Sequence, residues 1–208
     1  MNTKNKINWL IVHHTGGTEL DPLADTSSHT FEIVNAWHRN DPNVWLGFYS
    51  KLGYSIGYHY FIDKTGKVTQ GRLDGEQAAH TKNYNNNPTD PEANSAIGIC
   101  LAGNFDVTFP TKEQTDALQK LLNEKRKEYL IPRDRIVPHN HFSKKTCYGR
   151  HLDPAWASNL TVEEVNIPDP IIHTCVAQEA EIKALKEQLS WFDRLVTLLM
   201  SSLKFPRQ

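Results

Sequence analysis

The chain has 208 residues, with 23 lysines and arginines against 24 aspartates and glutamates, and a formal net charge of −1 when its histidines are neutral. This length allows one medium-sized domain with an appendage, and a charge near zero supplies no general attraction to a phosphate backbone. Nucleic acid is therefore excluded as an expected partner. The three cysteines are an odd number without the spacing of a disulfide framework, which fits synthesis in a reducing compartment.

The amino-terminal segment predicts neither a signal peptide nor a membrane span. The apolar run that follows its first polar residues is short and already contains His13 and His14. We therefore expect synthesis in the cytoplasm. If the target lies outside the cytoplasm, another factor must deliver the protein.

The first third of the chain predicts a strand followed by a helix. Residues 9–14 form an apolar run rich in branched side chains, which is typical of a buried strand. Residues 28–39 carry apolar side chains three apart and predict an amphipathic helix, with Ser27 or Ser28 available as its N-cap.

A hairpin and a second buried strand follow. Residues 58–62 and 68–70 flank a turn that contains Gly66, placed where a positive φ is expected. Residues 96–102 form a second apolar run that predicts another buried strand.

The second helix has the strongest local signal. Thr111 precedes Gln114 by three residues in a capping-box arrangement, and leucines then recur at helical spacing until Pro132. Residues 136–137 predict a short strand that leads into His139. Strands that alternate with helices, together with one hairpin, predict an α/β fold with a mixed central sheet flanked by helices.

The composition changes after the globular domain, which we place at residues 1–160. Residues 161–173 are expected to form a linker, and residues 174–205 an amphipathic, coiled-coil-like helix. Self-association through this helix would make the protein a homo-oligomer. The alternative is a helix that packs back on the domain, and the additional Leu195 and Leu198 widen its apolar stripe in that direction.

Two imidazoles and one thiol are candidate ligands for a metal ion. His139 precedes Cys147 by eight residues, and His13 ends the first apolar run. Zinc favours nitrogen and sulfur donors, and a catalytic zinc takes three protein ligands and keeps a fourth position open. Three ligands therefore suggest hydrolysis. A structural zinc would be closed by a fourth ligand, for which the candidates are His14, His141 and His151.

Five separated motifs resemble those of type 2 N-acetylmuramoyl-L-alanine amidases, in the superfamily of bacteriophage endolysins and peptidoglycan recognition proteins. They agree in order and in the interval between the last histidine and the cysteine, and they span roughly residues 7 to 160. The motifs are Val12-His13-His14-Thr15, Ile56-Gly57-Tyr58-His59-Tyr60, Ala79-His80-Thr81, Ser95-Ala96-Ile97-Gly98-Ile99, and His139 with Lys145 and Cys147.

The resemblance implies cleavage of the amide between N-acetylmuramic acid and the L-alanine that begins the peptidoglycan stem peptide. It also implies zinc as cofactor, with His13, His139 and Cys147 as ligands. His14 is then the neighbour that points away, as alternation along a strand requires, and His141 is the stronger of the two alternative ligands because a loop imposes no such alternation.

The same resemblance assigns two catalytic residues. Tyr58 would hydrogen-bond the attacking water and help move its proton toward the leaving nitrogen, whereas the alternative is a tyrosine packed in a strand. Lys145 would stabilise the tetrahedral oxyanion as a compact cation, a role that its neighbour Lys144 does not match.

Two positions depart from the family pattern. Cys100 stands where some relatives have a glutamate, so no carboxylate base is available there and the chain resembles the phage lytic branch. We interpret Cys100 as a buried apolar thiol. Tyr148 stands where many relatives have proline after the ligand cysteine, and we expect it to alter the loop without removing a ligand.

Substrate recognition is expected in a polar and aromatic groove beside the metal. His80 and Thr81 match family positions that line the stem-peptide cleft, and Asn85 is a further candidate. Trp37, Trp45 and Tyr54 have the shape to stack on sugars, but packing in the core explains them equally well.

Three functions follow from the sequence. The favoured one is a zinc amidase that degrades peptidoglycan as a phage or prophage endolysin and acts on the cell wall after release or delivery. A peptidoglycan-recognition module without catalysis is the second, and the retained Cys147, Tyr58 and Lys145 argue against it. The third is a wall-degrading component of a larger assembly, anchored by the helical tail.

Overall fold

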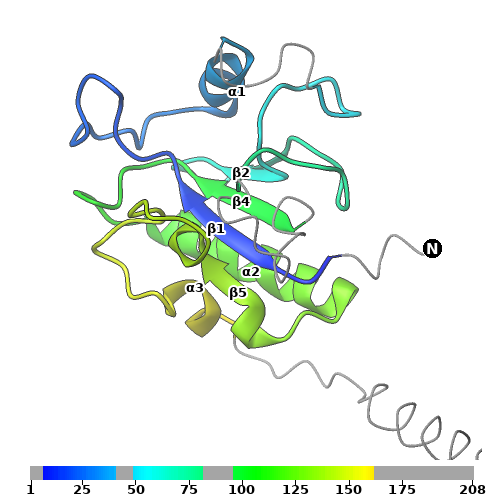
Figure 1. The fold of residues 1–208 in the computed structure, drawn as a ribbon. Coiled ribbons are helices and arrows are strands. Elements are labelled where there is room, and N and C mark those ends of the chain that lie inside the picture. Colours follow the sequence, from blue (N-terminus) through cyan, green and yellow to red (C-terminus); the bar gives the residue numbers. More distant parts are fainter. Residues whose placement is uncertain (1–6, 41–48, 82–95, 162–208) are drawn as a thin grey trace, which may run out of the picture. The chain divides into compact units, whose positions relative to one another are not determined.

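The computed structural model describes residues 7–40, 49–81 and 96–161 (Figure 1). The predicted tail helix at 174–205 lies outside the described residues, as do Asn85, Trp45 and all of the predicted linker except Thr161. The coiled coil and the homo-oligomer therefore stay predictions.

The fold is organised around one five-stranded mixed sheet, which confirms the predicted architecture. Its strand order is β3-β2-β4-β1-β5, and every neighbouring pair is parallel except the antiparallel hairpin of β2 and β3. The strands are β1 (Leu10–His14), β2 (Tyr60–Ile62), β3 (Val68–Gln70), β4 (Ile97–Leu101) and β5 (Ile136–Pro138).

The central strands are buried on both faces. Every residue of β1 and β4 is buried, which explains why these two segments are continuous apolar runs and do not alternate with polar residues. The hairpin turn is formed as predicted, with Gly66 at a φ of 81°.

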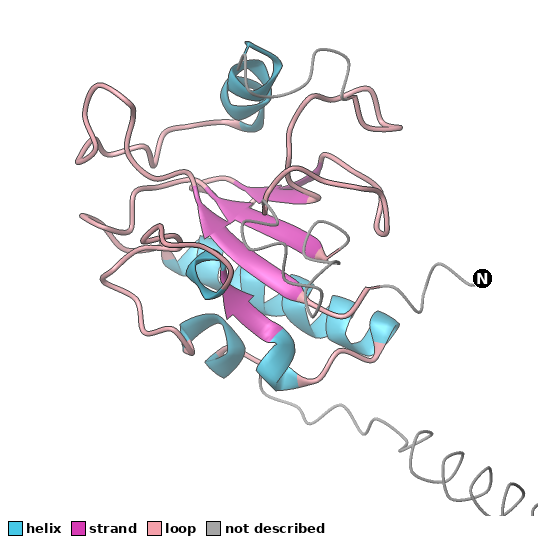
Figure 2. Ribbon diagram, in the orientation of Figure 1, coloured by secondary structure: helices cyan, strands magenta, loops and turns pink. Residues whose placement is uncertain are grey.

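Within residues 7–40, 49–81 and 96–161, three α-helices accompany the sheet, drawn in cyan in Figure 2. They are α1 (Phe31–Asn40), α2 (Lys112–Tyr129) and the short α3 (Trp156–Asn159), with 3-10 turns at η2 (Arg133–Arg135) and η3 (His139–His141). In the described residues, none of the helices has the length and apolar character that a membrane crossing requires.

The main hydrophobic core lies between α2 and one face of the sheet. Leu118, Leu121 and Leu122 of α2 pack there with Leu10 and Val12 of β1. The opposite face carries two smaller clusters, one of which includes Phe31 and Val34 of α1. Because α2 occupies one face, polar side chains that point from the strands to the other face can assemble a site.

The second helix begins and ends as its sequence predicts. The Thr111 hydroxyl accepts a hydrogen bond from the Gln114 N–H, and the Gln114 side chain accepts one from the Thr111 N–H, so the capping box is confirmed. The Gln114 amide also donates to the Ala102 carbonyl, 2.8 Å away, which ties the start of α2 to the end of β4. The helix ends at Tyr129, and Leu130 takes the left-handed conformation.

The predicted start of the first helix was wrong. Helix α1 begins at Phe31, and the Thr30 hydroxyl accepts a hydrogen bond from the Ile33 N–H, so Thr30 occupies the cap position expected for Ser27 or Ser28. Ser27 instead donates its N–H to the Asp25 carboxylate in a turn before the helix. Periodicity locates the helix, but such local hydrogen bonds decide which of several polar residues caps it.

A polar network joins the outer part of the sheet to α2. The Asp74 Oδ1 accepts a hydrogen bond from the Tyr60 hydroxyl at 2.8 Å. The Asp74 Oδ2 accepts one from the Tyr129 hydroxyl at 2.9 Å and lies 2.8 Å from the Lys125 Nζ. The side chains of Asp74 and Lys125 are only 11% and 8% exposed. Their interaction is therefore less screened by solvent than that of a surface pair.

This network makes Asp74 a predicted stability determinant. Replacing it with asparagine keeps the shape but removes the charge and leaves a tyrosine hydroxyl without an acceptor, which should lower the free energy of unfolding by about 2–3 kcal/mol. The measurement is urea unfolding of Asp74→Asn. Asp116→Asn is the matched control, because Asp116 pairs with Lys112 on an exposed part of α2 and should cost no more than about 0.5 kcal/mol. Equal losses in the two variants would contradict the assignment.

Candidate metal centre

The two adjacent histidines at the end of β1 point to opposite faces of the sheet, as strand alternation requires. His13 lies on the face away from α2, where its ring is 4.5 Å from that of His139 and 5.1 Å from that of Tyr58. His14 lies on the other face, where its Nδ1 accepts a hydrogen bond of 2.9 Å from the Phe105 N–H.

His139 reaches the same place because β5 runs parallel to β1. Pro138, the last residue of β5, is paired with Val12, so the next residues along the two segments, His139 and His13, lie side by side. The η3 turn begins at His139 and holds its side chain at 8% exposure.

Cys147 is delivered by a loop that is fixed at several points. The Thr146 hydroxyl donates to the Asp106 carboxylate at 2.6 Å, and the Arg150 N–H donates to its other oxygen at 2.8 Å. The Asn140 N–H donates to the Cys147 carbonyl at 2.7 Å, which ties the loop to the η3 turn. Asp106 was not singled out by the sequence, since 40 residues separate it from Thr146 and no local pattern links them.

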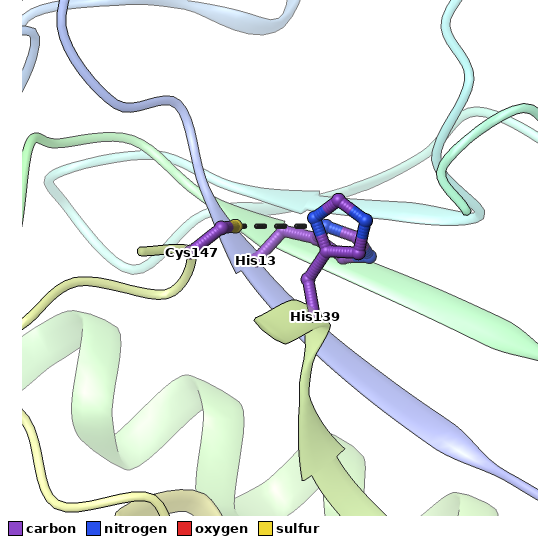
Figure 3. Close-up of side chains that lie close together, drawn as sticks. All are labelled: His13, His139 and Cys147. Atoms are coloured by element: carbon purple, nitrogen blue, oxygen red, sulfur yellow. Dashed lines mark hydrogen bonds between the residues drawn. The ribbon is translucent and has the colours of Figure 1, made fainter. Parts of the chain in front are cut away.

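The three predicted ligands form one group. Figure 3 shows the imidazoles of His13 and His139 converging with the thiol of Cys147, and one ligand atom from each lies within 4.8 Å of the others. The His13 Nδ1 is 3.7 Å from the Cys147 Sγ. Usual zinc bond lengths in a tetrahedron place nitrogen and sulfur ligands about 3.5 Å apart. The donor types and their spacing therefore fit zinc.

The alternative ligands lie elsewhere. His141 is exposed and packs against Trp9 and Phe142, with ring centroids 5.5 and 4.7 Å away. His151 stacks on Phe109. Among the described residues no fourth histidine, cysteine or carboxylate joins the group, so it has the composition of an open site rather than a closed structural one.

Burial keeps the two imidazoles neutral. It lowers the pKa of His139 to about 4 and that of His13 well below the ordinary value, and the neighbouring Lys145 acts in the same direction. Burial also raises the pKa of the Cys147 thiol to about 12, against the effects of the His14 N–H and Lys145. A divalent cation bound to the sulfur would stabilise the thiolate and so displace the thiol proton.

Tyr58 stands beside the three ligands. Its side chain packs against the cluster that contains Cys100. Burial, followed by the two nearby cysteines, raises the pKa of Tyr58 well above its ordinary value. The phenol therefore keeps its proton at neutral pH. Cys100 is fully buried, as predicted, and belongs to the cluster against which Tyr58 packs.

The Tyr58 segment is held by buried polar side chains. The His59 Nε2 donates to the Glu76 carbonyl at 2.9 Å, and its Nδ1 accepts from the Gly98 N–H at 3.1 Å. The fully buried Arg72 donates through Nε to the Ile56 carbonyl at 2.6 Å. These contacts tie the segment to β4 on one side and to residues 72–77 on the other.

Lys145 lies at the exposed rim of the metal centre. Its side chain is accessible to solvent, and its charge is close enough to lower the pKa of His13, His139 and Cys147. Its backbone N–H donates to the Ser143 hydroxyl, 3.3 Å away.

The residues assigned to peptide binding are not grouped on the described surface. His80 and Thr81 are 6% and 1% exposed, and His80 contacts His13. Trp37 is 43% exposed and makes a T-shaped contact with His29. Tyr54 is 36% exposed and makes a T-shaped contact with Phe31. A role for His80, Thr81 or Asn85 in peptide binding therefore stays a prediction.

Tyr148, which follows Cys147 in the chain, is buried. Its side chain is 1% exposed, and its hydroxyl lies 2.9 Å from the Asp153 carbonyl and 2.7 Å from the Pro154 carbonyl. Its ring also packs edge-on against Trp156 of α3. Tyr148 thus anchors the Cys147 loop to the segment around α3.

Comparison with known proteins gives a family and a fold. Residues 3–156 match the family model described as N-acetylmuramoyl-L-alanine amidase. The chain is 32% identical to peptidoglycan-recognition protein SD of Drosophila simulans over 145 residues, which are 69% of this chain and 67% of that protein. It is 29% identical to the endolysin of Enterobacteria phage K11 over 119 residues, which are 55% of this chain and 66% of that protein.

The solved structures agree on the fold. The structure of the N-acetylmuramoyl-L-alanine amidase LysC from Clostridium intestinale URNW superposes with a TM-score of 0.51 at 23% identity, covering 73% of this chain and 82% of that one.

The buried neutral histidines predict acid sensitivity of the metal-free protein. Burial lowers the pKa of His59 to about 4 from an ordinary value of 6.5. Between these values the unfolded chain binds a proton that the folded protein excludes, so the free energy of unfolding should fall as the pH decreases from about 6.5 to 4. The measurement is urea unfolding across this range with a chelator present.

His59→Asn tests the contribution of one imidazole, because its side-chain oxygen can still accept from the Gly98 N–H. Proton uptake on unfolding at about pH 5 should decrease by about one proton. His151→Asn is the control, since His151 is exposed and removing it takes away a group that solvent reaches in both states. Identical slopes of stability against pH in the His59 variant and the parent protein would refute the prediction.

Proposed function

The chain belongs to the N-acetylmuramoyl-L-alanine amidase family, and on that premise we propose that it is a zinc hydrolase that cuts the amide between N-acetylmuramic acid and L-alanine in peptidoglycan. The observation that carries this proposal is the convergence of His13, His139 and Cys147 in an open group. Tyr58 and Lys145 lie beside it, and the family match covers all five residues.

His13, His139 and Cys147 would hold the metal. When bound there, zinc supplies Lewis acidity, which polarises the scissile carbonyl and makes water a nucleophile at neutral pH. Two neutral imidazoles and one thiolate would leave the centre with a net charge of +1, so the ligands would not neutralise the cation.

Tyr58 is suited to proton transfer. Its phenol keeps its proton at neutral pH and is held beside His13 by packing against the α1 side of the sheet. From this position it can accept a hydrogen bond from the attacking water or donate one to the leaving nitrogen.

Lys145 is suited to charge stabilisation. Cleavage of an amide develops negative charge on the carbonyl oxygen, and an ammonium at the rim of the site can move toward this oxygen in the transition state. The solvent exposure of Lys145 gives its side chain that freedom. The two side chains thus divide proton transfer and charge stabilisation between them.

Recognition without cleavage is a second candidate function, because one of the relatives is named as a recognition protein. Cys147 is the residue that separates the two candidates, since non-catalytic relatives typically lack this ligand. Its presence in the group of three supports catalysis.

The biological setting we propose is that of a phage or prophage endolysin, supported by the similarity to the phage K11 endolysin. Such a protein is made in the cytoplasm and acts on the wall after release or delivery. The predicted helix at 174–205 would present several catalytic domains to one polymer, or would attach the amidase to a larger assembly.

The first test is chemical. Purified protein of known zinc content should release free stem peptides that begin with L-alanine from peptidoglycan, detected by mass spectrometry, and a chelator should abolish the release. Zinc-loaded protein that binds peptidoglycan but leaves it intact would favour the recognition module.

Two variants separate metal binding from catalysis. Cys147→Ala should lose zinc and activity together, because two imidazoles alone hold the ion weakly. Lys145→Ala should retain zinc and lose about 10²–10³-fold in kcat. The matched control is Lys144→Ala, which removes the same charge one residue earlier and should leave kcat within a few-fold. Normal hydrolysis by Lys145→Ala would exclude its proposed role.

A further inference from the structure

A chain of hydrogen bonds runs from a backbone carbonyl to the candidate metal centre. The His80 Nε2 lies 3.1 Å from the Ala96 carbonyl oxygen, and the His80 Nδ1 lies 3.1 Å from the His13 Nε2. His80 and His13 are 6% and 1% exposed, so water has little access to either ring. A buried imidazole that is hydrogen-bonded only to a carbonyl oxygen or to a second imidazole has nothing to offset a positive charge, so both rings are neutral.

The chemistry of the groups fixes where the hydrogens are. A carbonyl oxygen can only accept, so the His80 Nε2 carries the hydrogen, and a neutral imidazole has only one. The His80 Nδ1 is therefore bare and must accept its hydrogen bond from the His13 Nε2–H. The His13 Nδ1 is left with its lone pair, and this is the atom that lies 3.7 Å from the Cys147 Sγ.

The packing of His80 prevents its ring from turning away. Gly98 of β4 lies directly against it, and a Cβ atom at position 98 would meet the ring at 2.4 Å from Cδ2. The His59 ring packs edge-on against it, with centroids 5.7 Å apart. A glycine in the middle of a buried strand is thus explained by the close approach of this imidazole.

We propose that His80 is a positioning residue that holds His13 in the tautomer with a bare Nδ1 facing Cys147, so that the ligand is oriented before the metal binds. This inference rests on the proposed zinc function for its purpose, but the tautomer itself belongs to the metal-free protein. It gives His80 a role behind the metal ligand that differs from contact with the stem peptide. Partners of this kind typically contribute 10–100-fold to metal affinity.

The test uses two variants of nearly equal shape in the full-length chain. In His80→Asn the side-chain oxygen replaces Nδ1 and can accept from the His13 Nε2–H. In His80→Leu a methyl group stands there, and the buried donor loses its partner. Zinc affinity, measured by competition with a chromogenic chelator, should fall about 10–100-fold in His80→Leu and stay within a few-fold of the parent in His80→Asn.

The second readout is the histidine tautomer itself. Nitrogen-15 NMR of the metal-free parent protein at neutral pH should show His13 protonated at Nε2 and bare at Nδ1, and the same state for His80. His13 should keep this signature in His80→Asn and show exchange between states in His80→Leu. The parent spectrum needs no variant, so a folding defect in His80→Leu leaves the inference testable.

The outcomes separate the inference from the proposed function. A parent protein with a hydrogen on the His13 Nδ1, or equal zinc affinities in folded His80→Asn and His80→Leu, would overturn the role of His80 while leaving the zinc amidase intact. A parent protein with the expected tautomers that releases no stem peptides would instead refute the amidase and leave the positioning of His13 standing.

Discussion

The parallel pairing of β1 with both β4 and β5 is the constraint on which the candidate site depends. Parallel neighbours run in the same direction and end at the same edge of a sheet, so the residues near their carboxyl ends are brought together whatever their separation in the chain. His13 and His139 meet for this reason, with β1 at the centre and β5 at its side. The hydrophobic core between α2 and the sheet occupies one face, so the two histidines assemble on the opposite face.

Burial of these side chains has an electrostatic consequence. Burial holds the imidazoles neutral, and the neutral imidazole is the form that binds a metal ion. Burial also holds the thiol protonated, whereas the thiolate is the form that binds a metal ion. The group of ligands is thus only partly prepared in the metal-free protein. Lys145 at the rim and the His14 N–H both act to reduce the cost of forming the thiolate.

Polar contacts with distant parts of the chain supply the positional accuracy. The Cys147 loop depends on Asp106, and the Tyr58 segment depends on His59 and Arg72. None of these three is expected to touch substrate. His59 and Arg72 satisfy buried backbone groups, and Asp106 binds two exposed groups of the Cys147 loop. The same contacts that stabilise these segments therefore also orient the residues proposed to act in catalysis.

The sequence by itself determined the elements and the ligand candidates. Apolar runs located the central strands, the capping box located the start of α2, and the interval between His139 and Cys147 marked a pair of donors, because these signals lie within a few turns or strand lengths of one another. The sequence did not identify the N-cap of α1, because several polar residues precede the helix and the cap is Thr30, not Ser27 or Ser28. Strand alternation already predicted that His14 points away from the metal group, whereas tertiary structure alone decided that His141 lies apart from it and that His80 stands behind His13. Such contacts depend on sheet register and loop packing, which no local spacing encodes.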